Sequence, residues 1–564
     1  MKNILFNKLI NLIKNNLKKI SSVLYFVVIL IYELFYCNGQ IFNGGNYNFS
    51  LCRAILYILF FVMIFIFSNK FLENIENSFE NRLKKIAIII YIFGIILAIP
   101  ICIIIGIKTT LAVMAVCLIS VLMSGIFILL VSEDLIKNTV LIGITFGLIF
   151  CITTNFNHAL DERRHFMTAF NISFGNFDYE KNYITDETVL KIEQLQKFNS
   201  AIELFSVEYE PNITNEIVLD TPSSPADYSF IIYIPAALGI LVARILNASV
   251  LDMYIIGRIF NLTVYIALSC LILKILPFKK NIFYVVLNMP LIILLAASYS
   301  IDGMCVVLVL LFVAYCLKLY EQKDNIKMRQ IIMLMILGGL MLTAKSMGYV
   351  GVGFIIFILP ILKIIKDNKK YIPILAIIVI IFCTILVSLI LNTQIGSDDR
   401  VANTNSGGQI KNILNNPFLL ISVYKNHILS TILDISWYIQ LNPAVYFYET
   451  YKIVFSVMML LLILVSINDD SKTFTIKEKI IFMISFLAVY FVTSLALYIG
   501  FTEVGANNIG GYQTRYIIPV LPILLMCFSN NTIKVKIKGN EKILISIILG
   551  IITMVDIIGL IIVK

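Results

Sequence analysis

The sequence predicts an all-α protein that crosses a membrane about fifteen times. Of its 564 residues, 59% are hydrophobic, and the mean hydropathy is +0.92. Only 14% are charged, compared with about 25% in soluble domains. Apolar runs of about 17–25 residues, long enough to cross a bilayer, recur from one end of the chain to the other. Together these observations exclude a soluble enzyme that merely carries a membrane anchor.

The apolar runs are predicted to be helices because a backbone within lipid must satisfy its own hydrogen bonds, in a helix or in a closed barrel. They lack the alternation of polar and apolar residues that barrel strands require, which excludes a barrel. Before a long polar loop, the predicted spans are 19–36, 52–68, 86–107, 110–131 and 138–154. After the loop they are 254–276, 282–299, 303–320, 329–346, 348–366, 371–392, 452–467, 479–499, 514–529 and 542–563.

The positive charges indicate how the chain is oriented. The net charge is +10, but the lysines lie at span ends in short loops, so no nucleic-acid partner is expected. Residues 1–19 contain lysines and no acid, which places the N-terminus in the cytoplasm. The segment 228–248 is apolar enough to span, but counting it as a span would move every later basic loop outside. We therefore predict that it is a helix lying against the outer face.

This orientation leaves two long loops outside, 155–227 and 393–451. The first is rich in acids, and the second contains segments near 412–440 that we expect to form short interfacial helices. The chain then divides into three parts. Residues 1–137 form extra N-terminal helices, 138–530 form a core that carries both outer loops, and 531–564 form a cytoplasmic loop and a last span.

The first candidate site follows the fifth span. Asp161 and Glu162 are adjacent acids just outside the membrane, and His165 shares a helical face with Asp161 at a spacing of four residues. A carboxylate in low-dielectric surroundings holds a proton more tightly, which suits a general base. The alternative is a helix cap with a solvated ion-pair face.

Two more candidates lie at the outer ends of later spans. Asp302 follows a Ser-Tyr-Ser-Ile stretch and is either functional or the cap of the next helix. Arg515 lies in a polar stretch with Gln513 and Tyr516, at 510–519. Its guanidinium either binds a phosphate in a bidentate fork or reaches lipid headgroups.

Arg258 and Lys345 also fall near the outer side, as substrate-binding residues or as anchors at the membrane interface. No cofactor is firmly indicated. Asp161 and Asp302 are compatible with one divalent metal ion but do not require it.

Four stretches in order resemble the bacterial membrane family named domain of unknown function 2142, over about 150–530. The first contains Asp161-Glu162, His165-Phe166, Ala169-Phe170, Ile172-Ser173 and Gly175. The second contains Tyr228, Tyr233-Ile234-Pro235-Ala236, Leu238-Gly239, Arg244, Gly257-Arg258 and Asn261-Leu262. The third runs from Pro290 through Ala296-Ala297-Ser298 to Asp302, and the fourth has Gly511, Gln513, Arg515-Tyr516 and Pro519. Leu160 and Arg163 stand where prolines are expected, and Thr514 replaces a glycine.

That family in turn looks like the C-type glycosyltransferases, polytopic enzymes that use polyprenyl-phosphate sugars as donors. The resemblance implies a core of that type and a role for each site residue. Asp161 would deprotonate an acceptor hydroxyl, and Glu162 would position it. Asp302 would orient the acceptor or a metal, and Arg515 would bind the lipid phosphate and stabilise the leaving group.

The expected function is therefore sugar transfer on the outer face of the plasma membrane. The donor would be a polyprenyl-phosphate sugar held in the lipid bilayer, and the acceptor an extracytoplasmic glycan, glycolipid or protein. Two alternatives stay open: a transporter or flippase for lipid-linked glycans, and a non-catalytic partner in envelope assembly. A transporter is expected to place polar groups at mid-membrane, often on broken helices.

Overall fold

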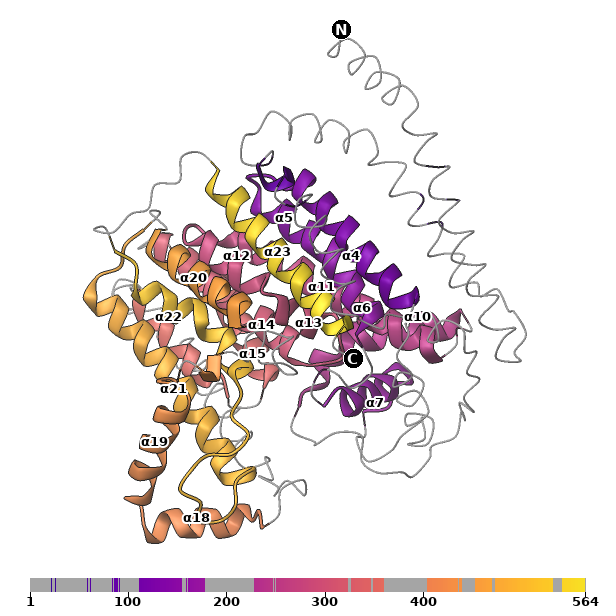
Figure 1. Cartoon of the computed structure of the whole chain (residues 1–564). Coiled ribbons are helices and arrows are strands. Elements are labelled where there is room, and N and C mark those ends of the chain that lie inside the picture. Colours follow the sequence, from indigo (N-terminus) through magenta and orange to yellow (C-terminus); the bar gives the residue numbers. More distant parts are fainter. Residues whose placement is uncertain are drawn as a thin grey trace.

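The computed structural model describes most of the chain between residues 111 and 562 (Figure 1). Apart from isolated positions, the described ranges are 111–154, 161–177, 228–246, 250–322, 326–345, 348–359, 403–434, 452–468, 472–530 and 540–562. Every element that lies in them is a helix, which confirms the predicted all-helical class. The predicted spans at 19–36, 52–68, 86–107 and 371–392 lie mostly or wholly outside the described residues.

Four helical segments of the described chain are long and apolar enough to cross a membrane. The first is Leu135–Ile152, built from α5 (Leu135–Ile142), a π-helical turn η1 (Gly143–Gly147) and α6 (Leu148–Thr153). The others are Asp252–Ile275 in α11 (Val250–Ile275), α14 (Asp302–Gln322) and α21 (Ile476–Gly500). Each lies where a span was predicted.

Further helices match predicted spans in position. They are α4 (Leu111–Leu130), α15 (Met328–Ala344), the 3-10 helix η3 (Val350–Ile358), α20 (Lys452–Asn468) and α23 (Glu541–Ile562).

Two predicted spans are not single helices. The one at 282–299 is divided into α12 (Lys280–Leu287) and α13 (Pro290–Ala296). The break falls at Pro290, which lacks an amide hydrogen and forces the preceding residue out of the helical region. The one at 514–529 begins with two 3-10 turns, η8 (Thr514–Tyr516) and η9 (Ile518–Val520), before α22 (Leu521–Cys527). Pro519 and Pro522 lie near the starts of these pieces.

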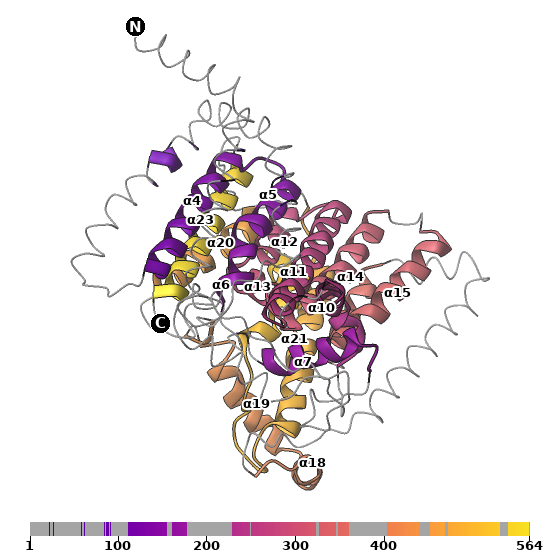
Figure 2. The same ribbon diagram turned by 90° about the vertical axis from the view of Figure 1, so that its right-hand side faces the viewer.

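Helix α14 forms the centre of the bundle, between α11, α13 and α15 (Figures 1 and 2). Of its apolar span, 89% is buried inside the protein. A helix that is apolar all round needs every side covered by other helices or by lipid, and for α14 it is mostly other helices that do so. This burial makes α14 the axis around which the other spans are arranged.

The two ends of α14 carry different polar groups. At its C-terminal end Glu321 pairs with Lys472 at 2.7 Å, and Tyr320 donates to Glu478 at 2.6 Å. At its N-terminal end lies Asp302, one of the candidate site residues. A helix of 21 residues rises about 30 Å, roughly the thickness of a bilayer core. The protein therefore has two polar ends on opposite sides of an apolar bundle.

A short 3-10 turn η2 (Phe230–Tyr233) and α10 (Ile234–Ile245) form the predicted helix of the 228–248 segment. Helix α10 packs on α11 and on α7 (Glu162–Ser173), near the end of the bundle that holds Asp302. Its position relative to the bilayer stays a prediction.

Two further helices, α18 (Ser406–Asn415) and α19 (Leu419–Ser430), extend beyond the bundle beside α21 (Figure 1). They expose Leu414, Phe418 and Ile421. Between α19 and α21 lies an apolar groove of about 570 Å³ that includes Ile428 and Phe491. These exposed apolar side chains are typical of helices at a membrane interface, as predicted for this region.

Candidate functional site

The site begins at the sharp turn that enters α7. Asp161 occupies the N-cap position with φ of 62°, in the left-handed region, and its side chain makes no capping hydrogen bond. Among residues with a side chain, Asp and Asn tolerate this conformation best. The carboxylate therefore does not serve the helix as the simple cap that the sequence alternatively suggested. Its side chain is 35% exposed, and its Oδ2 lies 3.9 Å from Arg515 Nη2.

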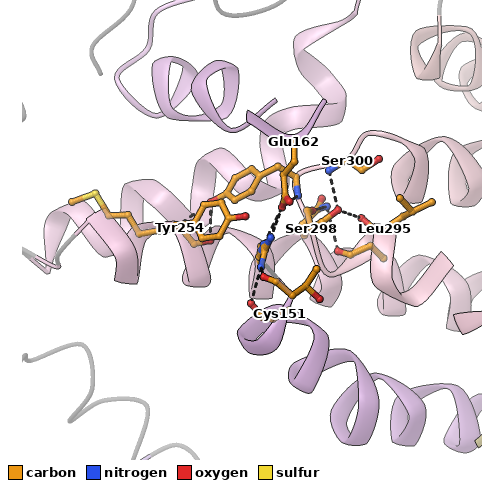
Figure 3. Close-up of polar contacts among 12 residues, drawn as sticks. Cys151, Glu162, Tyr254, Leu295, Ser298 and Ser300 are labelled. Atoms are coloured by element: carbon orange, nitrogen blue, oxygen red, sulfur yellow. Dashed lines mark hydrogen bonds and ion pairs between the residues drawn. The ribbon is translucent and has the colours of Figure 1, made fainter. Parts of the chain in front are cut away.

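Glu162, its neighbour, is completely buried. Its Oε1 accepts from Arg258 Nε at 2.9 Å and Nη2 at 2.7 Å, and from the amide of Tyr299 at 3.1 Å (Figure 3). Arg258 also donates from Nη1 to the carbonyls of Cys151 and Thr154, at 3.2 and 2.7 Å. One carboxylate and one guanidinium thus join the end of α6, the start of α7, α11 and the loop before α14.

This geometry changes the predicted role of Arg258. Its side chain is 1% exposed and sits 4.3 Å over the ring of Tyr254, so it reaches neither the membrane surface nor an open site. The interface-anchor prediction is wrong for this residue, because an anchor needs its charged head in water. Direct substrate binding by Arg258 finds no support in this position. The positioning role that the resemblance implies for Glu162 stays a prediction.

The loop before α14 is held by its own polar contacts. Ser298 Oγ donates to the carbonyl of Leu295 at 2.8 Å and accepts from the amide of Ser300 at 3.1 Å (Figure 3). Asn261 Nδ2 donates to the Ser298 carbonyl at 2.8 Å. Ser300 Oγ in turn donates to Asp302 Oδ2 at 3.2 Å. These bonds fix the Asp302 carboxylate, which is only 5% exposed, at the start of α14.

Arg515 lies between two of the predicted acids. Its Nη1 is 2.9 Å from Asp302 Oδ2, and its Nη2 is 3.9 Å from Asp161 Oδ2. The guanidinium is 8% exposed, so it does not reach outward to headgroups. The fold thus brings together three residues that are more than a hundred positions apart in the chain, and the sequence predicted all three for one site.

Lys345 completes the cluster of charges. Its Nζ is 3.4 Å from Asp302 Oδ1 and 3.8 Å above the ring of Tyr516. Arg515 also lies near that ring, 5.4 Å from its centroid. We call Asp161, Asp302, Lys345, Arg515 and Tyr516 the charge cluster. Two cations and two carboxylates balance each other in it, as buried charges require.

His165 adjoins the charge cluster from α7. Its Nδ1 is 2.8 Å from the hydroxyl of Tyr233, and its ring packs edge-on against Tyr228. Burial is the main cause that lowers the pKa of His165 to about 4; Asp161 and Asp302 oppose this shift, and Arg515 and Lys345 add to it. The imidazole is therefore neutral near pH 7 and is able to exchange a proton without carrying a permanent charge.

Gln513, predicted to bind substrate, lies directly before η8 and two residues before Arg515. Its side-chain oxygen is buried and accepts no hydrogen bond from the described residues. A buried acceptor of this kind has a strong preference for a donor. The position is compatible with the predicted role, which stays a prediction.

The described residues contain no group of three or more His, Cys, Asp or Glu side chains that would hold a metal ion. Asp161 and Asp302 are the two predicted ligands, and the Arg515 guanidinium occupies the space between them. These two carboxylates therefore already share a cation. In this arrangement they do not fit a metal ion.

Several residues of the site were not predicted to take part in it. Tyr233 and Ser300 bond directly to His165 and Asp302, and Tyr299 donates its amide to Glu162. Tyr299 and Ser300 lie within three residues of Asp302, in a stretch whose polar character interrupts an apolar run. That interruption was the available signal. Nothing in the local sequence of Tyr233 links it to His165.

Residues 144–524 match the family described as "Predicted membrane protein (DUF2142)". No curated protein and no solved structure matches the chain. The match covers more than half of the 564 residues and includes every residue of the charge cluster. Helices α4 and α23, which pack on each other, lie outside the matched range. The chain therefore belongs to this family of predicted membrane proteins, DUF2142.

Proposed function

We propose that the protein is a membrane glycosyltransferase that moves a sugar from a polyprenyl-phosphate donor to an acceptor hydroxyl at the outer face of the plasma membrane. One observation carries the proposal. Arg515 lies between two carboxylates, Asp161 and Asp302, with Lys345 on the other side of Asp302, all at one end of an apolar bundle. A lipid-phosphate donor has its tail in the bilayer and its phosphate at this depth.

In the proposed reaction Asp161 is the base. The side chain of Asp161 is more exposed than that of Asp302, and its carboxylate accepts the proton from the acceptor hydroxyl. The acceptor oxygen forms a bond to the anomeric carbon of the sugar as the bond from that carbon to the phosphate oxygen breaks. The electron pair of the broken bond stays on the polyprenyl phosphate.

Arg515 and Lys345 stabilise the negative charge of the leaving group. As the bond to phosphate breaks, negative charge grows on the phosphate oxygens, and fixed donors aimed at this charge lower the barrier. Arg515 supplies a planar fork and Lys345 a point charge, two donors that suit phosphate. The buried ion pair between Glu162 and Arg258 fixes the backbone next to Asp161. Acceptors of several kinds fit this chemistry: a wall glycan, a glycolipid or a protein.

The experiment compares envelope glycans from cells that carry the intact gene, a deletion, and Asp161→Asn. Asparagine tolerates φ of 62° as aspartate does, so the turn is retained while the base is lost. Glu503→Gln is the matched control, because it removes an exposed acid outside the charge cluster. All variants are compared at equal membrane abundance.

We expect Asp161→Asn and the deletion to lose the same sugar and to accumulate the lipid-linked donor, while Glu503→Gln behaves as wild type. If Asp161→Asn leaves the glycans intact while the deletion alters them, the acid is not a catalytic base. In that case the transporter or assembly function is favoured over the transferase.

A further inference from the structure

The Asp302 carboxylate receives one cation on each of its oxygens. Oδ2 lies 2.9 Å from Arg515 Nη1, and Oδ1 lies 3.4 Å from Lys345 Nζ. The side chains of Asp302 and Arg515 are 5% and 8% exposed. The Lys345 side chain, at 19%, is the more open of the two cations. The buried Arg515 and the partly exposed Lys345 thus converge on one point, and a carboxylate occupies that point.

The same point suits a phosphate. Carboxylate and phosphate oxygens accept from the same guanidinium and ammonium donors, at similar distances. The donor phosphate is a diester that carries one charge, as a carboxylate does, and its lipid tail holds it beside the site. When the sugar leaves, the phosphate becomes a monoester with more charge and is then the stronger ligand for two cations. Ser300 also donates to Asp302 Oδ2, which helps hold the carboxylate in its place. Any anion that enters has to displace a ligand that belongs to the protein itself.

We propose that Asp302 occupies the phosphate-binding position of the charge cluster when no donor is bound, and that the donor phosphate displaces it from Arg515 and Lys345. This inference rests on the proposed function. It adds that the Asp302 carboxylate competes with the donor phosphate for Arg515 and Lys345, and we call Asp302 the competitor. Asp302 makes the two cations unavailable to free anions of similar charge, whereas the donor is held beside the site by its tail in the bilayer. The displacement also frees Asp302 for the acceptor at the moment when the donor arrives.

The proposal predicts that removing the acid improves binding. Asp302→Asn keeps the shape of the side chain and removes its charge, so both cations are released for an incoming anion. We expect Asp302→Asn to bind farnesyl phosphate, a short prenyl phosphate, at least about tenfold more tightly than wild type does, as expected when one close like charge is removed. Loss of a site residue ordinarily weakens binding, so this direction is diagnostic.

The measurement is calorimetric titration of the purified full chain in detergent. Glu503→Gln is the control for removal of one negative charge elsewhere and is expected to bind as wild type does. Ser300→Ala loosens Asp302 without altering a charge, and is expected to give a smaller gain. It also provides the test if Asp302→Asn fails to fold. Arg515→Gln is expected to abolish binding in each background.

The outcomes separate the two proposals. Equal or weaker binding by Asp302→Asn, with wild-type binding that depends on Arg515, overturns the competitor and retains the transferase. The absence of binding in wild type and in both gain variants overturns both. Inorganic phosphate is titrated in parallel. If it binds as tightly as farnesyl phosphate and gains equally in Asp302→Asn, the competitor is supported and the lipid-linked donor is overturned.

Discussion

At the residue scale, the adjacent acids Asp161 and Glu162 have opposite surroundings. Glu162 is fully buried with Arg258, whereas Asp161 is one-third exposed and lies 3.9 Å from Arg515. The residues alone predicted two adjacent acids just outside the membrane, and the resemblance implied that Asp161 is the base and that Glu162 has a positioning role. Removal of one partner from a buried ion pair leaves an uncompensated charge, which is costly, whereas a partly exposed pair contributes little.

The two acids should therefore differ in their effects on stability. Glu162→Gln is expected to lower the free energy of unfolding by about 3–5 kcal/mol, because Arg258 is left buried without its counter-ion. Asp161→Asn is expected to change it by less than about 1 kcal/mol. Thermal unfolding of the purified variants in detergent measures the contrast. Equal melting temperatures for the two variants would contradict the buried pair.

The pKa of His165 gives a pH dependence with a defined sign. Burial lowers the pKa of His165 to about 4, from 6.5 in the unfolded chain. Between these values the unfolded state binds more protons, so stability increases with pH. The contribution is complete above about pH 6.5 and is lost as the pH falls towards 4, by roughly 3 kcal/mol in total.

The measurement is the melting temperature of wild type and of His165→Gln from pH 4 to 8. Wild type should lose more stability than the variant as the solution is acidified. Parallel curves would show that His165 does not carry the effect. The other described histidine with a pKa of about 4, His427, is present in both proteins and cancels in the comparison.

At the element scale, the contact between α10, α11 and the loop before α14 depends on small residues. A side-chain carbon at Gly257 would lie 2.0 Å from the Tyr299 hydroxyl. Tyr299 cannot retreat, because its hydroxyl donates to the carbonyl of Tyr254 at 2.9 Å and its ring stacks on Tyr254. Small residues commonly mark such close approaches between membrane helices.

Gly257→Ala should therefore destabilise the protein by about 1–3 kcal/mol, the usual cost of overpacking. Gly339→Ala in α15 is the matched control, since nothing lies within 4 Å of the added carbon. Alanine is the better helix former, so the control is expected to be neutral or slightly stabilising. Thermal unfolding of both variants distinguishes them, and an equal shift would argue against the Tyr299 contact.

The sequence predicted the elements well where hydropathy alone decides. The spans that became α11, α14 and α21 were found within a few residues of their ends. The interruptions at 288–290 and at 514–520 were missed, although prolines mark both. An apolar run looks alike whether or not it is broken. Only the lost amide of proline and the crowding of neighbouring helices determine where a break occurs.

For the site, the sequence supplied the chemistry but not the partners. Asp161, Asp302, Lys345 and Arg515 were all singled out, and the fold brings them together. The pairing of Glu162 with Arg258, 96 positions away, was not foreseen. Burying a charged residue at a span end costs free energy, so such a residue is expected to have a partner. Which partner does so depends on helix packing, which hydropathy does not encode.

At the scale of the whole molecule, the two polar ends of the bundle should lie on opposite sides of the membrane. Glu503 lies in the loop between α21 and the η8 turn of the charge cluster, and Lys477 lies at the start of α21. Basic residues favour the cytoplasmic side. We therefore predict that the end with Lys477 lies inside and that the end with Glu503 and the charge cluster lies outside.

Cysteine labelling tests this orientation. Glu503→Cys should react with a membrane-impermeant maleimide in intact cells, whereas Lys477→Cys should react only after permeabilisation. Both positions are exposed in the folded protein, and the parent chain gives the background from its own cysteines. The reverse labelling pattern would place the charge cluster in the cytoplasm and overturn the outer-face assignment.

The spread of the charge cluster along the chain also matters during synthesis. Arg515 is made 354 residues after Asp161 (515 − 161), which at about 5–20 residues per second is roughly 20–70 s later. Until then the carboxylates at 161 and 302 lack the guanidinium that joins them. A chain that stalls or is cut short before Arg515 therefore retains both acids of the charge cluster, with Lys345 beside Asp302 but without the guanidinium between them. Such a product cannot bind phosphate through Arg515, although most of its predicted spans have already been made.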